Sequence, residues 1–154
     1  MFGTIKLTQG KEVLVDKEDF DILNKYKWFA HKRGNYIYAC RSENGKTIQM
    51  HSVIAKTPKG LETDHIDGDT LNNQKRNLRV CTKSQNQHNR KISSNNKSGF
   101  KGVSYNKKNK KWQADIQCNG VKIYLGYFNN KLNAYKAYCD ACLRYHGNFT
   151  NLTR

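Results

Sequence analysis

The feature that most constrains this chain is an acid-free run of 45 residues, at positions 70–114. It holds twelve Lys and Arg, whereas the preceding 69 residues carry eleven basic and ten acidic side chains. Without carboxylates nearby these cations cannot form local ion pairs, so they face solvent or a polyanion. A solvated basic linker would explain the run. A surface that follows phosphates explains it too, because each neutralised phosphate releases counterions and thereby favours binding.

The rest of the composition excludes several classes of protein. Mean hydropathy is −0.91 and no long apolar run is present, so we expect no membrane-spanning helix. The N-terminus lacks a basic region followed by an apolar stretch, so we expect no signal peptide and a cytoplasmic protein. Five cysteines without a spacing pattern argue against a disulfide framework. Aromatic residues make up 11% of the chain, enough ring surface to build a core.

Residues 1–60 alternate short apolar stretches with turns. The pattern predicts strands at 4–7 and 13–15, a helix capped by Asp16, a hairpin turning at Asn44-Gly45 and a short helix from His51. Four aromatic residues here are interpreted as core rather than as base-stacking platforms: Trp28, Phe29, Tyr36 and Tyr38.

Residues 61–92 predict a strand, a polar loop, a second strand and a helix. The strands lie at 63–66 and 78–81, and the loop between them is dense in turn formers. Thr82 and Gln85 match a capping box, so the helix begins after Thr82 and extends to about Lys91.

Four polar residues of this segment can form a catalytic site. Asp64 and His65 are adjacent on a strand and face opposite sides, so one can bind a metal while the other addresses a water. Asn77 can hold one imidazole nitrogen and leave the other as a base. Asn86, one turn into the helix, can join Asp64 in an oxygen ligand set suited to Mg²⁺. Singly, each has a plainer explanation: Asp67-Gly68-Asp69 as a turn, Asn77 as a cap.

Together, several runs in this segment strongly resemble the HNH endonuclease family, in the branch of phage and intron homing nucleases with the ββα-metal fold. The runs are Asp64-His65-Ile66-Asp67-Gly68, Leu71-Asn72-Asn73, Asn77-Leu78-Arg79, Ser84-Gln85-Asn86 and Asn89-Arg90. The match covers 61–92 closely and 12–60 more loosely.

The resemblance implies Asp64 and Asn86 as metal ligands and His65 as general base, with Asn77 orienting that base. The family's last motif position can be His or Asn, and His88, on another helix face, is the less favoured ligand. Some relatives carry a structural zinc held by two cysteine pairs. Here Cys139-Asp140-Ala141-Cys142 is the only C-x-x-C, so we expect no structural zinc and interpret both helix cysteines as packing residues.

Residues 99–154 predict a separate module of three antiparallel strands and one helix, after a polar linker at 93–98. The strands lie at 102–105, 111–117 and 121–126, and the helix spans 133–145. One face of the sheet packs on the helix, and the other is available for a DNA major groove.

This module resembles the plant ethylene-response-factor (APETALA-type) DNA-binding domain. The matching residues are Gly102-Val103, Lys111-Trp112, Ala114-Asp115-Ile116, Leu125-Gly126-Tyr127-Phe128, Ala137-Tyr138, Ala141, Leu143 and Gly147. The resemblance implies that six side chains face DNA: Ser104, Asn106, Trp112, Gln117, Lys122 and Tyr124. Arginines that read guanines in the plant domains are Ser104, Asn106 and Gln117 here, so the plant target is not expected.

Basic residues of both segments supply further expected DNA contacts: Arg76, Arg79, Lys83, Arg90, Lys101 and Lys111. The predicted fold class is α+β, with a ββα-metal (HNH) nuclease unit followed by a small three-stranded antiparallel sheet plus one helix. We predict an HNH nuclease domain over 1–92 with a β-rich lead-in and a core motif at 61–92. The linker is 93–98, and the ethylene-response-factor-like domain is 99–154.

The predicted function is a sequence-directed DNA endonuclease of the phage homing type, hydrolysing a phosphodiester bond with one divalent ion, Mg²⁺ or Mn²⁺. Its partner is double-stranded DNA, with no membrane and no small-molecule cofactor. We favour a monomer, in the bacterial cytoplasm if the protein is phage-encoded. One rival is a non-enzymatic DNA-binding transcriptional regulator, which would not need the four residues of the catalytic set. A second rival is an RNA-binding accessory protein, since basic charge alone does not separate RNA from DNA.

Overall fold

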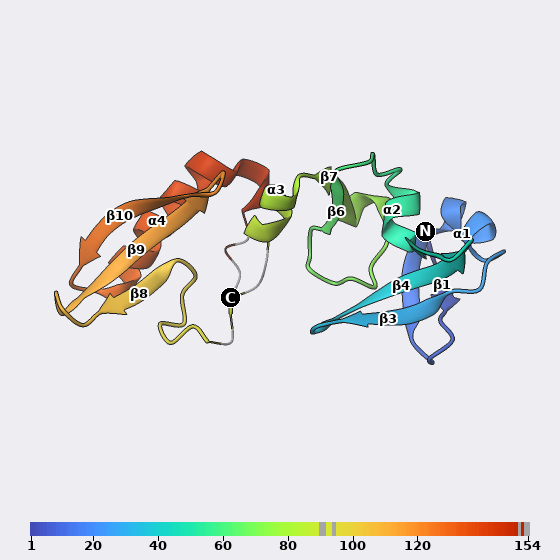
Figure 1. Ribbon diagram of the computed structural model, residues 1–154, viewed down its shortest axis with the longest axis horizontal. Helices are drawn as coiled ribbons and strands as arrows, with labels where there is room; N and C mark the ends of the chain where they lie inside the picture. Colours follow the sequence, from blue (N-terminus) through green and yellow to red (C-terminus); the bar gives the residue numbers. More distant parts are fainter. Residues whose placement is uncertain (90–91, 94, 151, 153–154) are drawn as a thin grey trace. The chain divides into compact units, whose positions relative to one another are not determined.

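The computed structural model describes residues 1–89, 92–93, 95–150 and 152, and divides the chain into two units, Met1–Lys83 and Ser84–Arg154 (Figure 1). The division falls ahead of the polar stretch 93–98. The functional domains 1–92 and 99–154 stay a prediction. Among the described residues, no helix has both the length and the apolar character needed to cross a membrane.

The first unit begins with an antiparallel hairpin, β1 (Phe2–Lys6) and β2 (Glu12–Asp16), followed by α1 (Lys17–Leu23). Both strands and the helix are where the sequence predicts them. Asp16 stands at the N-cap position of α1, but its carboxylate makes no cap. It accepts instead from the backbone N–H of Lys75, at 2.7 Å, and so ties this hairpin to the loop of the site described below.

A three-stranded antiparallel sheet follows, in the order β3 (Phe29–Arg33), β4 (Tyr36–Glu43) and β5 (Lys46–Gln49). Figure 1 shows β3 and β4 side by side. The predicted turn is confirmed, since Asn44 and Gly45 have φ of 50° and 72°, the left-handed conformation of a tight hairpin. β3 has no counterpart among the predicted strands because its sequence, FAHKR, does not alternate clearly between apolar and polar residues.

One apolar core holds this unit together. Its buried members are Ile5, Leu7, Val13, Val15, Leu23, Trp28, Ala39, Met50 and Ile54. Of the four aromatic residues interpreted as core, only Trp28 lies in it. Phe29, Tyr36 and Tyr38 are half-buried on the other face of the sheet, because neighbouring residues of a strand point to opposite sides and Ala39 takes the core side.

The chain then forms α2 (Met50–Ile54), β6 (Glu62–His65), the short 3₁₀ helix η1 (Lys75–Asn77), β7 (Leu78–Cys81) and α3 (Lys83–His88). β6 and β7 pair antiparallel, with Asp64 opposite Arg79 and His65 opposite Leu78. The polar loop between them is fastened to β2, where the Leu14 N–H donates to the Leu71 carbonyl at 2.8 Å. The predicted order strand, loop, strand, helix is confirmed, although Lys91 lies outside the described residues.

The second unit contains the antiparallel sheet β8 (Val103–Asn106), β9 (Lys111–Cys118) and β10 (Val121–Phe128) and the helices α4 (Lys131–His146) and η2 (Gly147–Phe149). Its three strands and long helix are as predicted. One face of the sheet packs on α4 through buried apolar residues: Val103, Ala114, Ile116, Ala134, Tyr138, Ala141 and Cys142. Cys142 is thus a packing residue. Gly102 has a φ of 70°, and a Cβ there would collide with the Tyr138 ring.

The whole is a mixed α/β protein of small sheets and few helices, compatible with the predicted α+β class.

Candidate active site and nucleic-acid interface

His65 is the last residue of β6, and a side-chain amide holds its ring. Its exposed fraction is 4%, and Nε2 lies 2.8 Å from Oδ1 of Asn73, which is fully buried. Because an amide oxygen only accepts, this bond places the ring proton on Nε2 and the lone pair on Nδ1. Burial lowers the pKa of His65, so the ring is neutral near pH 7. A neutral imidazole with a defined tautomer is suited to accept a proton.

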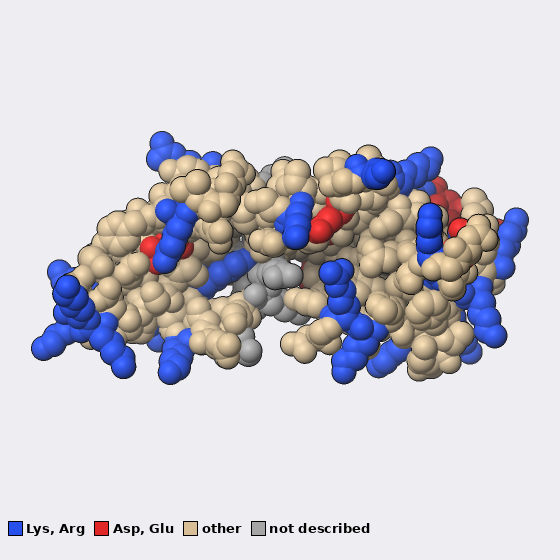
Figure 2. Space-filling model, in the orientation of Figure 1, with Lys and Arg blue, Asp and Glu red and all other residues tan. Residues whose placement is uncertain are grey.

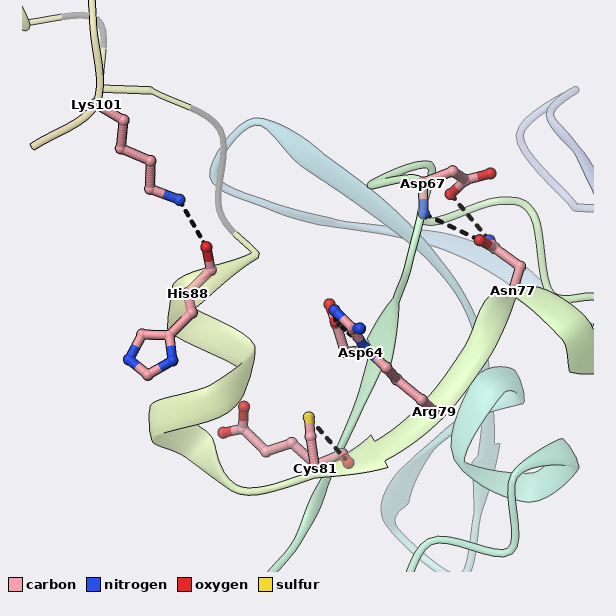
Figure 3. Close-up of polar contacts among 8 residues, drawn as sticks. Asp64, Asp67, Asn77, Arg79, Cys81, His88 and Lys101 are labelled. Atoms are coloured by element: carbon pink, nitrogen blue, oxygen red, sulfur yellow. Dashed lines mark hydrogen bonds and ion pairs between the residues drawn. The ribbon is translucent and has the colours of Figure 1, made fainter. Parts of the chain in front are cut away.

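Asn77 holds the loop around His65. Its Nδ2 donates to Asp67 Oδ1 at 2.9 Å (Figure 3). The same Nδ2 donates to the Asn72 carbonyl at 2.8 Å. Its Oδ1 accepts from the Asp67 N–H at 3.0 Å, and its carbonyl accepts from the Ile66 N–H at 2.9 Å. The imidazole contact that the sequence predicts for Asn77 is made by Asn73. Asn77 bonds the Asp67 carboxylate and the backbone on either side of the turn.

Asp67 is the centre of that turn. Burial raises its pKa, but the bonds from the Asp69 N–H, Asn72 and Asn77 outweigh burial and hold the pKa of Asp67 below its usual value. The carboxylate is therefore charged, and both of its oxygens accept hydrogen bonds from within the loop. The plainer reading of Asp67-Gly68-Asp69 as a turn and the catalytic reading of its neighbours are both compatible with this geometry.

Asp64 is a buried carboxylate paired across the hairpin with Arg79. Nε and one terminal nitrogen of the guanidinium lie 2.8 and 2.6 Å from Oδ2 of Asp64 (Figure 3). The exposed fraction of Asp64 is 5%, so its charge needs such a partner. Arg79, predicted to contact DNA, thus compensates the charge of Asp64 in this structure.

The oxygen donors predicted to hold a metal lie in different units. Asp64 belongs to the first, whereas Asn86 lies on α3 in the second and is described only relative to that unit. Within the described residues, no group of three or more His, Cys, Asp or Glu side chains could hold a metal ion. One carboxylate and one amide oxygen still fit Mg²⁺, which commonly keeps water and takes substrate phosphate for its other ligands.

Two further rings that the sequence analysis missed surround His65. The ring centroid of His51, from α2, lies 5.0 Å from that of His65, and the centroid of Tyr38 lies 5.5 Å from His51 and 6.3 Å from His65. Burial, and then the nearby His65, lower the pKa of His51 to about 3. No described group bonds its buried Nδ1. Both residues precede the motif, so no spacing pattern linked them to it.

In the second unit, the strand register separates the predicted DNA contacts by face. Ala114 and Ile116 point toward α4, so the residues beside them on β9 point away from it. Cross-strand pairing places six predicted residues on this open face: Ser104, Asn106, Lys111, Gln117, Lys122 and Tyr124. Trp112 does not join them. It shares the face of Ala114 and packs against the core, which corrects its predicted placement toward DNA.

A chain of polar contacts spans the open face. The Asn106 amide donates to Gln113 at 3.3 Å, the Gln113 amide donates to Asp115 at 3.0 Å, and Lys122 pairs with Asp115 at 3.1 Å. Tyr124 and Tyr127 meet edge to face, with ring centroids 5.2 Å apart. Lys and Arg side chains are scattered over the visible surface of each unit, and few acidic ones lie among them (Figure 2).

The remaining basic residues predicted to contact DNA occupy varied positions. Arg76 donates to Gln74 at 3.2 Å, and Lys83 is exposed at the start of α3. Lys101 donates to the His88 carbonyl at the end of α3, at 2.6 Å (Figure 3). Arg90 lies outside the described residues.

His88, the less favoured ligand, stacks on His146 with ring centroids 3.5 Å apart. Burial, with His146 and Lys101 nearby, lowers its pKa to about 4. The His88 ring therefore packs against His146 within the second unit.

Comparison with known proteins identifies the segment around His65. Residues 55–88 match the family model described as HNH endonuclease. An uncharacterized HNH endonuclease of Acanthamoeba polyphaga mimivirus is 34% identical over 119 residues, which are 73% of this chain and 59% of that protein. Protein 3.8 of Escherichia phage T7 is 40% identical over 63 residues, 41% of this chain and 52% of that protein. No solved structure matches the chain.

Residues 55–88 are therefore similar to the HNH endonuclease family, which supports the predicted nuclease, and the chain has viral relatives. It spans less than two thirds of the length of either relative.

Proposed function

We propose that the protein is a divalent-metal-dependent DNA endonuclease in which His65 takes a proton from the water that attacks a phosphodiester bond. The contact between His65 Nε2 and Asn73 Oδ1 carries this proposal, within the segment that matches HNH endonucleases. Burial lowers the pKa of His65 and keeps the ring neutral, and the contact puts the ring proton on Nε2, so the Nδ1 lone pair can accept the proton of a water. A positioned base of this kind contributes roughly 10²–10⁴-fold to a hydrolysis rate.

The other residues of the site support the base. Asp64 and Asn86 would hold the ion, Mg²⁺ or Mn²⁺, in a ββα-metal arrangement of β6, β7 and α3. The ion supplies charge neutralisation at the scissile phosphate and at the leaving oxygen. Arg79 holds the Asp64 carboxylate in the hairpin, and Asn77 with Asp67 keeps the turn that follows His65 in one conformation.

The second unit would direct the nuclease to its DNA. The open face of β8, β9 and β10 carries six of the predicted DNA contacts, and hydrogen bonds and an ion pair link Asn106, Gln113, Asp115 and Lys122 on it. Polar side chains held in this way can read base edges. The resemblance of its strands and helix to the ethylene-response-factor domain supports a DNA-binding role for this unit. The viral relatives of the chain support a homing role in a phage.

Nicking of a supercoiled plasmid tests the proposal. We expect the full chain to nick it with Mg²⁺ or Mn²⁺ and not with EDTA. His65→Ala is expected to nick roughly 10²–10⁴-fold more slowly while binding the same DNA as tightly. Equal nicking by His65→Ala, or no nicking by the full chain with either ion, would overturn the proposal.

A further inference from the structure

We propose that one face of the β3–β4 hairpin holds the sugar-phosphate backbone of DNA where it enters the His65 site. This surface, named the Tyr38 face, consists of Phe29, His31, Arg33, Tyr36 and Tyr38. The inference rests on the proposed nuclease function and adds to it a substrate-binding surface outside the segment that matches HNH endonucleases.

Strand register puts these side chains together. Arg33 lies opposite Tyr36, and His31 lies opposite Tyr38, so each pair shares one face of the sheet. The Phe29 and His31 rings are 6.4 Å apart, and the Tyr36 and Tyr38 rings are 6.5 Å apart. The apolar core lies on the other side of the sheet, so the Tyr38 face does not pack against it.

The Tyr38 face is continuous with the candidate base. Tyr38 touches both His51 and His65, at ring-centroid distances of 5.5 and 6.3 Å. The hairpin is also fastened to the loop of the site, because Thr70 Oγ1 donates to the Ile37 carbonyl at 2.6 Å. The surface therefore leads from exposed Arg33, at the turn, to the buried ring of His65.

Its charge fits a polyanion. β3 ends in His31, Lys32 and Arg33, all exposed, and contains no acidic residue. None of the ion pairs in the described part of the chain involves these three residues. The acid of β4, Glu43, lies at the far end of that strand, where it pairs with Arg41 at 3.2 Å. Cations and tyrosine hydroxyls are common donors to DNA phosphates and sugars.

The hairpin offers its own matched control. Lys32 and Arg33 are neighbours, both cationic and both exposed, but Lys32 lies opposite Ile37 on the other face. If charge in general attracts DNA to this hairpin, the two substitutions act alike. If the Tyr38 face holds the backbone, only Arg33 matters.

We would measure binding of a labelled duplex over a salt series, with Arg33→Gln and Lys32→Gln each placed in full-length His65→Ala, which need not cut. Loss of one phosphate contact reduces the slope of log affinity against log salt by roughly 0.9 and weakens binding roughly eightfold at about 0.1 M salt. We expect this for Arg33→Gln, and an unchanged slope for Lys32→Gln. In the cutting protein, Arg33→Gln is expected to raise KM for DNA by a similar factor.

Equal slopes for the two variants would overturn the inference. Because binding is measured without cleavage, its outcome is separate from that of the proposed function. A chain that cuts DNA but binds it equally well with Arg33→Gln retains the function and loses the Tyr38 face. If the chain never cuts DNA but the slope of log affinity against log salt falls only with Arg33→Gln, the Tyr38 face is supported and the proposed nuclease function is wrong.

Discussion

The amide of Asn73 and the ring of His65 are both buried and lie 2.8 Å apart, Oδ1 to Nε2. Asn73→Ala leaves Nε2 without this acceptor. An unsatisfied buried donor costs about 1–3 kcal/mol. We therefore expect a loss of that size in the free energy of unfolding, measured in urea, together with slower nicking.

The double variant Asn73→Ala, His65→Ala shows whether Asn73 acts through the ring. In that case the double variant nicks no more slowly than His65→Ala alone. A further loss in the double variant would give Asn73 a separate role in catalysis.

His51 makes stability depend on pH. Its pKa is about 3 in the folded chain, because of burial and then His65, against a usual 6.5. Between these values the unfolded chain binds more protons, so the stability contributed by neutral His51 is present above pH 6.5 and is lost as pH falls toward 3. His51→Phe keeps a ring beside Tyr38 and removes this dependence.

We expect the stability of His51→Phe relative to the parent chain to increase as pH falls below 6.5, by at most about 1.4 kcal/mol per pH unit. Urea unfolding at pH 7.5, 6 and 5 provides the measurement. His51→Ala serves as the control for ring packing and is destabilised at every pH. A difference between His51→Phe and the parent that does not change with pH would contradict the assignment.

Lys101 stabilises the end of α3. Its ammonium lies 2.6 Å from the His88 carbonyl, and burial lowers the pKa of Lys101. Carbonyls at a helix C-terminus lack intrahelical partners and favour a nearby cation. Lys101→Met is therefore expected to speed amide hydrogen exchange in α3, and to weaken the apparent Mg²⁺ affinity of nicking if Asn86 is a ligand.

Lys97→Met is the matched control, because Lys97 is an exposed lysine of the same segment. Equal protection of the α3 amides in the two variants would show that Lys101 does not hold the helix.

The cysteines differ in reactivity. Burial, then Asp64 and Glu62, raise the pKa of Cys81 to about 11, and its Sγ donates to the Glu62 carbonyl at 3.6 Å (Figure 3). Burial also raises the pKa of Cys40 and Cys142. Because the thiolate is the reactive form, iodoacetamide at pH 8 is expected to modify the half-exposed Cys118 and Cys139 first. Peptide mass spectrometry locates the label, and early labelling of Cys81 in the folded chain would be the contrary result.

Local patterns in the sequence were sufficient for most elements. Neighbouring residues determine β1, β2, the Asn44-Gly45 turn, and the three strands and helix of the second unit. These elements could therefore be predicted from local sequence patterns. Residues 55–88, which match HNH endonucleases, could also be recognised from neighbouring residues, because Asp64 and His65 are adjacent on one short strand. The short strand β3 lacked such a pattern and was missed.

Tertiary structure decided which side chains meet. The sequence placed Asn77 on the imidazole and Trp112 toward DNA, whereas packing brought Asn73 to His65 and turned Trp112 to the core. His51 and Tyr38 joined the site from elements that precede the motif. These outcomes depend on the register between strands and on how a loop packs against a distant hairpin. Residue types along the chain determine which contacts are chemically possible, but only the packed chain selects among them.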